Sequence, residues 1–184
     1  MKYKNLMVDI ETLGDTNSAA MVSIAAVAFD KFGDPGPALS YNIYLDDALK
    51  LGNVSASTLQ WWAKEDRTVF HNMLNNGYIK TADALSELSV FSELCLDDNF
   101  KIWANGPDFD LKIIEDKIEK LKDYSVYKFW SPWNQRCVRT VKAIDPTLAK
   151  SFINNEKHNP LQDCYTQIAQ IKAIDEKYNL SLIS

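Results

Sequence analysis

Hydrophobic and polar positions divide the chain into a strand-rich beginning and a largely helical remainder. Lys4–Ile10 is mostly apolar, Met21–Asp30 is nearly continuous in small and aliphatic residues, and Ser40–Leu45 alternates aromatic and aliphatic residues. A cluster of glycine, proline and aspartate at 33–37 predicts a turn before the third segment. Long apolar runs indicate buried strands, and three of them joined by short links predict an antiparallel meander.

The pattern then changes to apolar residues three and four positions apart, which is typical of amphipathic helices. Helices are expected at 57–64, 67–75, 82–96, 110–121 and about 160–178, with a short strand at 101–104. A meander followed by strands alternating with helices predicts an α/β fold, in which helices flank a mixed sheet. No repeat, low-complexity tract or linker interrupts the 184 residues, so we expect a single domain over 1–184.

Acidic residues stand where the expected strands end and helices begin. Asp9 and Glu11 end the first strand with one residue between them, so both side chains point to the same face of the sheet. At an effective dielectric constant of 20, two charges ~4 Å apart repel by about 4 kcal/mol. Asp110 stands where the short strand passes through a Gly-Pro turn into a helix. These positions can bring the three carboxylates to one cleft.

The start of the last helix adds a fourth acid and a histidine. Asn159 is a plausible N-cap and Pro160 suits the first helical position, which places Asp163 in the first turn. His158 lies just outside the helix, so His158 and Asp163 are expected to border the same cleft.

Converging carboxylates repel one another unless a cation lies among them. Oxygen ligands suit Mg²⁺ or Mn²⁺, and two ions ~3.5–4 Å apart can clamp the attacking and leaving oxygens of a phosphoryl displacement. An imidazole with an ordinary pKa of about 6.5 suits the removal of a proton from water. His158 is therefore the candidate general base, a role that contributes roughly 10²–10⁴-fold to the rate.

The same residues resemble a known family. Asp9-x-Glu11-Thr12-x-Gly14, Asn105-Gly106-x-x-Phe109-Asp110 and His158 with Asp163 resemble the three motifs of the DEDDh 3′–5′ exonucleases, which are DnaQ-like members of the ribonuclease H-like superfamily. Three further segments are similar to the exonuclease A proteins of T4-like phages and to exodeoxyribonuclease VIII and mycobacterial exoribonuclease-like relatives; they are Ser57–Trp62, Trp103-x-Asn105-Gly106 and Trp133–Arg136 with Val138-Arg139-Thr140. Pro160 stands where the family's histidine motif has a small residue.

The resemblance implies a ribonuclease H-like fold with a five- to six-stranded mixed sheet and a site holding two Mg²⁺ or Mn²⁺ ions. It implies hydrolysis of single-stranded nucleic acid from a free 3′ end to nucleoside 5′-monophosphates. DNA is favoured as substrate, an exoribonuclease is the alternative, and an idle binding module or a phosphodiesterase of small nucleotides are further alternatives. The implied metal ligands are Asp9, Glu11, Asp110 and Asp163, and the expected substrate contacts are Thr12, Leu13, Asn105, Phe109, Trp62 and Arg139.

Several positions keep two interpretations. Asp108 competes with Asp110 for the third acidic position and is otherwise a helix cap or surface acid. One of Trp61 and Trp62 is expected in the core, while the alternative is stacking on a base. The basic residues Arg136, Arg139 and Lys142 are candidates for phosphate contacts, and His71 is expected to be structural.

Composition narrows the function classes. A formal net charge of −5 argues against coating of duplex nucleic acid, but it is compatible with holding one strand end in a cleft. The chain has three cysteines without a C-x-x-C motif, which indicates free thiols and a reducing cytoplasm. No apolar run approaches ~18 residues and the first residues show no secretory pattern, so no membrane association is expected.

Overall fold

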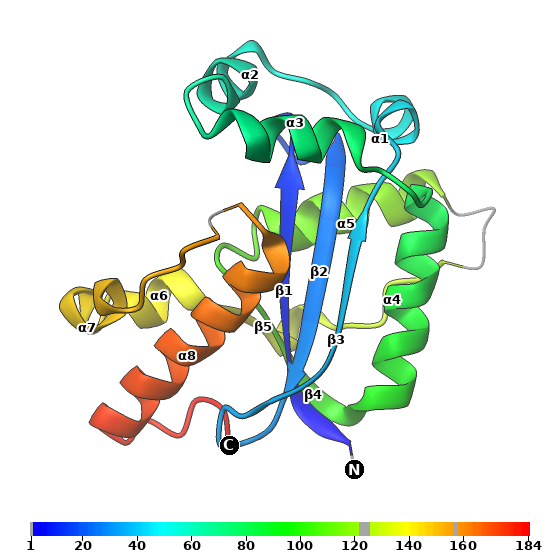
Figure 1. Cartoon of the computed structure of the whole chain (residues 1–184). Coiled ribbons are helices and arrows are strands. Elements are labelled where there is room, and N and C mark those ends of the chain that lie inside the picture. Colours follow the sequence, from blue (N-terminus) through cyan, green and yellow to red (C-terminus); the bar gives the residue numbers. More distant parts are fainter. Residues whose placement is uncertain (1, 122–125, 157) are drawn as a thin grey trace.

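The computed structural model describes residues 2–121, 126–156 and 158–184. Its centre is a mixed sheet with the strand order β3-β2-β1-β4-β5, in which β1, β2 and β3 are antiparallel and β4 and β5 run parallel to β1 (Figure 1). The strands are β1 (Tyr3–Thr12), β2 (Met21–Phe29), β3 (Pro35–Asn42), β4 (Leu96–Ala104) and β5 (Gln135–Cys137). The predicted meander and mixed sheet are confirmed, with five strands among the described residues.

Helices cover the sheet and extend beyond its upper end in Figure 1. They are α1 (Leu45–Leu51), α2 (Ala56–Trp62), α3 (Arg67–Asn75), α4 (Thr81–Cys95), α5 (Asp110–Lys120), α6 (Val138–Lys142), α7 (Pro146–Ser151) and α8 (Pro160–Tyr178), with a 3₁₀ turn at Pro132–Asn134. No helix within the described ranges combines the length and apolarity needed to cross a membrane.

The third strand differs from its predicted range of 40–45. It spans Pro35–Asn42, because β3 is an edge strand and a proline is tolerated at its beginning. After Asn42 the regular pairing of β3 with β2 ends; the Ile43 amide still donates to the carbonyl of Val22, Ile43 forms an isolated bridge with Ile79, and Leu45 begins α1. The pattern of hydrophobic and polar positions also did not predict four short elements, each of seven residues or fewer: α1, α6, α7 and β5.

Alternation along β1 assigns its side chains to two cores on opposite faces of the sheet. Leu6, Val8 and Ile10 pack in the core covered by α4 and α5, whereas Met7 packs in a second core with α8. Asp9 and Glu11 have the same parity as Met7, so they share the face on which α8 lies. β1 therefore places both carboxylates near the beginning of α8, at the end of the sheet that this helix does not cover.

Candidate active site

Three carboxylates from two distant segments meet at the end of β1. One carboxylate oxygen each from Asp9, Glu11 and Asp163 lies within 4.8 Å of the others. Asn159 caps α8 by accepting a hydrogen bond from the backbone amide of Leu161, and Pro160 occupies its first position, as expected from the sequence. The cap fixes where α8 begins and thereby places Asp163 opposite β1.

Asp110 completes the group of four acids from the first turn of α5. It is 5% exposed, and its Oδ2 accepts a hydrogen bond of 3.3 Å from the backbone amide of Gly106. Asp110 lines the same cavity of about 260 Å³ as Asp9, Glu11, Asp163 and His158. Asp108 is exposed and does not line this cavity, so the structure favours Asp110 over Asp108.

The surroundings of these carboxylates disfavour their charged forms. Burial, followed by the charges of Asp110, Glu11 and Asp163, raises the pKa of Asp9 well above its usual range. Burial and the charges of Asp163 and Asp110 raise the pKa of Glu11 from 4.5 to about 8. Burial raises the pKa of Asp110 to about 6, even though the amides of Gly106 and Ile10 and the charge of Arg139 act to lower it.

These pKa values predict how stability depends on pH without metal. Because folding raises the pKa of Glu11, the folded chain binds the Glu11 proton more tightly than the unfolded chain does. The free energy of unfolding in EDTA should therefore fall as pH rises from 4.5 to about 8, by an amount on the order of a few kcal/mol. Urea unfolding at several pH values measures this, and addition of Mg²⁺ at pH 8 should reverse the loss. A free energy of unfolding that rises over this pH range would contradict the burial of unpaired acids.

His158 borders the acidic cavity from the residue before the α8 cap. Its Nδ1 lies 3.8 Å from Glu11 Oε1 and its Nε2 lies 3.5 Å from Glu65 Oε2. The backbone of His158 is left-handed, with φ of 64°. The imidazole packs edge-on against Trp61 and Trp62 at ring-centre distances of 5.0 and 5.2 Å. Contacts on several sides therefore hold the imidazole ring of His158 beside the carboxylates.

Three supporting residues were missed by the sequence analysis. Gln167 Nε2 donates to Asp9 Oδ1 at 2.8 Å, and Asn154 Nδ2 donates to Asp163 Oδ1 at 2.9 Å. Glu65 faces His158. Only Gln167 had a signal in the sequence, since it lies four positions after Asp163 and therefore on the same side of α8. Asn154 and Glu65 lie in connections whose course the pattern of apolar residues does not reveal.

Asn105, Phe109 and Arg139 line the acidic cavity, as three of the expected substrate contacts. The guanidinium of Arg139 approaches the backbone of Gly106 closely because Gly106 lacks a side chain; a Cβ at Gly106 would lie 3.0 Å from Arg139 Nη2. Lys142 Nζ donates to Asn105 Oδ1 at 2.7 Å, so a second cation stands beside the first. Arg136 instead donates to two backbone carbonyls and lies outside this cavity.

Trp62 is misassigned as a substrate contact. It is 1% exposed, it stacks on Phe70, and its Nε1 donates to the carbonyl of Thr12 at 2.9 Å. A ring enclosed in this way has no face open to a base. Trp61 is 43% exposed and is the member of the pair with an accessible ring.

Thr12 and Leu13 are also buried, with 7% and 3% of their surfaces exposed. The Thr12 hydroxyl donates to the carbonyl of Gly14, and the backbone of Leu13 pairs with Ala20 and Ser55. The structure therefore does not bring these two side chains to the acidic cavity. His71 is exposed on α3 and contributes nothing to this cavity.

The donor set fits a divalent cation. The four acids offer only carboxylate oxygens, which are the ligands preferred by Mg²⁺ and Mn²⁺. A cation among Asp9, Glu11 and Asp163 would offset the burial and repulsion that raise the pKa values of Asp9 and Glu11, and the burial that raises the pKa of Asp163. The buried Oε1 of Gln167 has no hydrogen-bond partner within the described residues and faces the same region, where it could accept from water bound to a cation.

The chain is similar to several known nucleases. A curated relative, the exodeoxyribonuclease of Enterobacteria phage T4, is 23% identical over 201 residues, covering 91% of this chain and 87% of the relative. Escherichia coli exonuclease I, solved with single-stranded DNA and zinc, superposes with a TM-score of 0.69 at 14% identity. That match covers 98% of this chain but only 42% of the exonuclease I chain.

Schizosaccharomyces pombe Pop2p, solved with Mg²⁺ and Mn²⁺ bound, superposes with a TM-score of 0.61 at 14% identity, covering 99% of this chain and 86% of Pop2p. At such identities these structures establish the shared ribonuclease H-like fold. A family model, the 3′-5′ exoribonuclease Rv2179c-like domain, matches residues 4–174. The chain therefore belongs to the family of Rv2179c-like 3′–5′ exoribonuclease domains, and the resemblance to DEDDh-type exonucleases is confirmed.

Proposed function

We propose that the chain is a metal-dependent 3′–5′ exonuclease that releases nucleoside 5′-monophosphates from the free 3′ end of single-stranded nucleic acid. The observation that carries this proposal is the convergence of Asp9, Glu11 and Asp163 within 4.8 Å, in a cavity that Asp110 and His158 also line. A site built from carboxylates with one imidazole beside them suits phosphodiester hydrolysis.

In this proposal Asp9, Glu11, Asp110 and Asp163 hold two Mg²⁺ or Mn²⁺ ions. Such ions, when bound, would supply Lewis-acid stabilisation of the phosphate and a water that ionises near neutral pH. His158 takes up the proton of the attacking water at a ring nitrogen, and its packing against Trp61 and Trp62 restricts where the ring can move. Arg139 lines this cavity and Lys142 lines an adjoining one with His158 and Asp163, and both cations orient phosphate groups.

We propose DNA as the favoured substrate and RNA as the second candidate. The phage T4 relative that covers 91% of the chain is an exodeoxyribonuclease, which supports DNA. The family model that matches residues 4–174 is described as an exoribonuclease, which supports RNA. The two substrates differ at the 2′-hydroxyl, so the discrimination depends on contacts to the sugar.

Hydrolysis of 5′-labelled DNA and RNA oligonucleotides of the same sequence tests the proposal. With Mg²⁺ or Mn²⁺ the linear strands should shorten one nucleotide at a time, with DNA faster, and EDTA should stop the reaction. A circular single strand is the control and should remain intact because it has no 3′ end. Cleavage of the circle would contradict exonuclease action, and intact linear strands with both metals would contradict nuclease activity.

Two further proposals concern the whole chain. Residues 1–184 form one exonuclease domain, since α8 near the end of the chain supplies Asp163 to the site that begins on β1. The protein works in a reducing cytoplasm, bacterial or that of a phage-infected host, because Cys95, Cys137 and Cys164 are all free thiols.

A further inference from the structure

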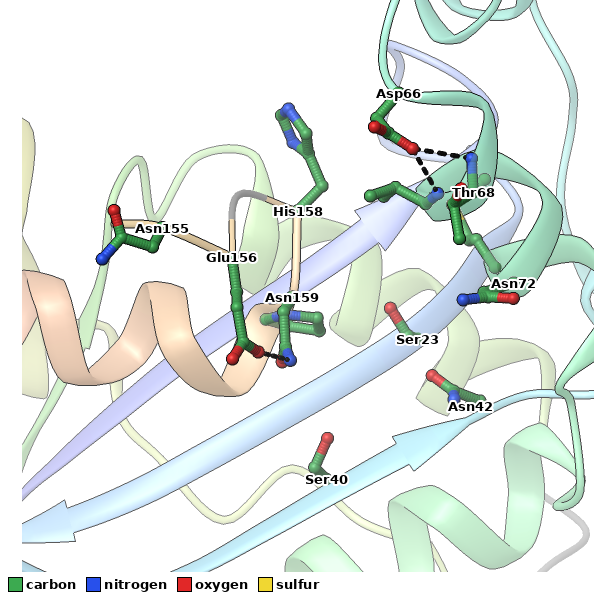
Figure 2. A pocket seen from close by; sticks show the side chains of 13 residues that line it. Ser23, Ser40, Asn42, Asp66, Thr68, Asn72, Asn155, Glu156, His158 and Asn159 are labelled. Atoms are coloured by element: carbon green, nitrogen blue, oxygen red, sulfur yellow. Dashed lines mark hydrogen bonds between the residues drawn. The ribbon is translucent and has the colours of Figure 1, made fainter. Parts of the chain in front are cut away.

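A groove of about 510 Å³ lies beside the acidic cavity, and His158 lines both. Figure 2 shows its three sides: strand residues below, α3 with Thr68 and Asn72 on one side, and the segment before α8 on the other. Its volume is in the range of roughly 300–1,000 Å³ that is typical of ligand pockets. The groove has no role in the metal site described above.

The register of the sheet connects the groove to the acids. Glu11 pairs with Ser23 across β1 and β2, and Ser23 pairs with Asn42 across β2 and β3. Directly opposed residues share one face of a sheet, so this row runs from a metal-binding acid to the floor of the groove. The neighbouring row runs from Asp9 through Ala25 to Ser40. The floor is therefore a direct continuation of the catalytic face.

The polar groups of this groove are mostly uncharged. Ser23, Ser40, Asn42 and Asn72 offer hydroxyls and amides, while Val69 and Met73 add apolar surface; no lysine or arginine among the described residues lines it. Its two acids are already engaged, because Asp66 caps α3 through the amides of Thr68 and Val69, and Glu156 accepts from Asn159 Nδ2. The groove therefore does not suit a phosphate, because its lining holds two acids and, in the described part of the chain, no lysine or arginine.

Several of these polar groups make no side-chain hydrogen bond to other residues that the structure describes. Ser23 is 3% exposed, and no hydrogen bond within the described ranges engages its hydroxyl or the side-chain amides of Asn42 and Asn72. An asparagine amide presents a donor beside an acceptor, which matches the edge of a nucleobase. Asn42 is half-buried and Asn72 is exposed, so both amides are accessible to a ligand with similar edges.

Cations gather on the other side of the acids. Arg139, Lys142 and Lys150 line a separate cavity of about 320 Å³ between α6, α7 and α8. The site therefore has a basic side that suits phosphates and a neutral side that suits uncharged groups. A single strand crossing the acids can place its backbone toward α6 and a base toward α3.

Resting on the proposed exonuclease function, we propose that the groove between α3, β3 and the segment before α8 binds a nucleobase of the single-stranded substrate. Asn42 and Asn72 hydrogen-bond the edge of the base, and Val69 and Met73 contact its face. The groove thus contributes affinity through the base and not through the phosphate.

Binding in EDTA tests this inference without hydrolysis. Fluorescence anisotropy compares a 5′-labelled ten-nucleotide DNA strand with a strand of equal length whose last three positions at the 3′ end are abasic. The double variant Asn42→Ala/Asn72→Ala should weaken binding of the normal strand about tenfold and binding of the abasic strand less than about twofold. The abasic strand keeps every sugar and phosphate, so only a base contact produces this difference.

Controls separate the groove from folding and from catalysis. Asn76→Ala removes an exposed amide at the end of α3 and should bind both strands as the unaltered chain does. Asn72→Ala alone should give part of the effect with an unchanged melting temperature, because Asn72 is exposed on α3. Equal weakening of both strands, no weakening, or no binding of either strand by the unaltered chain would overturn the groove proposal. Absence of hydrolysis with normal base-dependent binding would instead overturn the exonuclease proposal alone.

Discussion

Replacement of Asp9 by asparagine should reduce hydrolysis of a single-stranded oligonucleotide by at least about 10³-fold. One carboxylate oxygen of Asp9 lies within 4.8 Å of an oxygen each from Glu11 and Asp163, and Asp9 is 8% exposed, so Asp9 is a central member of the acidic group. Loss of one carboxylate from a metal site removes several kcal/mol of transition-state stabilisation, and about 4 kcal/mol corresponds to a thousandfold.

The same replacement should make the chain more stable in EDTA. Burial and neighbouring acids raise the pKa of Asp9, so its charged form is destabilising above that pKa. Asparagine retains an oxygen that can accept from Gln167 Nε2, and it removes the charge. An activity loss together with a higher melting temperature in EDTA distinguishes a lost metal ligand from a folding defect.

Asp108→Asn is the matched control, because it makes the same acid-to-amide change at an exposed position near the start of α5. Its activity should stay within about twofold of the unaltered chain, since surface changes are usually close to neutral. If Asp9→Asn remained fully active, or if Asp108→Asn were as inactive as Asp9→Asn, the assignment of the acids would be wrong.

Replacement of His158 by asparagine should slow turnover roughly 10²–10⁴-fold while binding of divalent metal is retained. Asparagine is the informative choice because His158 has φ of 64°, a left-handed conformation that asparagine adopts more readily than alanine. An alanine variant would combine the loss of the imidazole with added backbone strain. Steady-state rates at saturating substrate, with metal binding followed in parallel, measure the effect.

His71→Asn is the matched control for that experiment. His71 is exposed on α3 and lies outside the acidic cavity, so its replacement should leave turnover unchanged. Unchanged turnover in His158→Asn would refute the assignment of His158 as general base. A parallel loss of metal affinity would show that His158 acts on the metal site and not on the water.

The sequence predicted those parts of the site that depend on local periodicity. The parity of Asp9 and Glu11 on one strand sets their common face, and the cap at Asn159 with Pro160 fixes the position of Asp163 on α8. Both features follow from neighbouring residues alone. Their convergence was inferred from the chemistry and the family resemblance, and the parallel pairing of β1 with β4 beside α5 brings Asp110 to the same edge.

Residues whose positions depend on packing over long sequence distances were not predicted correctly. Trp61 and Trp62 are adjacent, and Trp62 is the buried ring, stacked on Phe70 and hydrogen-bonded through Nε1 to the carbonyl of Thr12, fifty positions away. The edge strand β3 has half-exposed residues and a weak apolar pattern, so its start at Pro35 was missed. Glu65 reaches His158 across a turn between α2 and α3, which no periodic signal describes.

Calorimetric titration of the metal-free chain with Mn²⁺ at pH 8 examines the acidic cluster itself. The unaltered chain should bind two ions, with release of protons because burial holds the pKa of Glu11 at about 8, and Asp9→Asn should bind far more weakly. Absence of Mn²⁺ binding by the unaltered chain, or equal binding by Asp9→Asn, would contradict a metal site among these carboxylates.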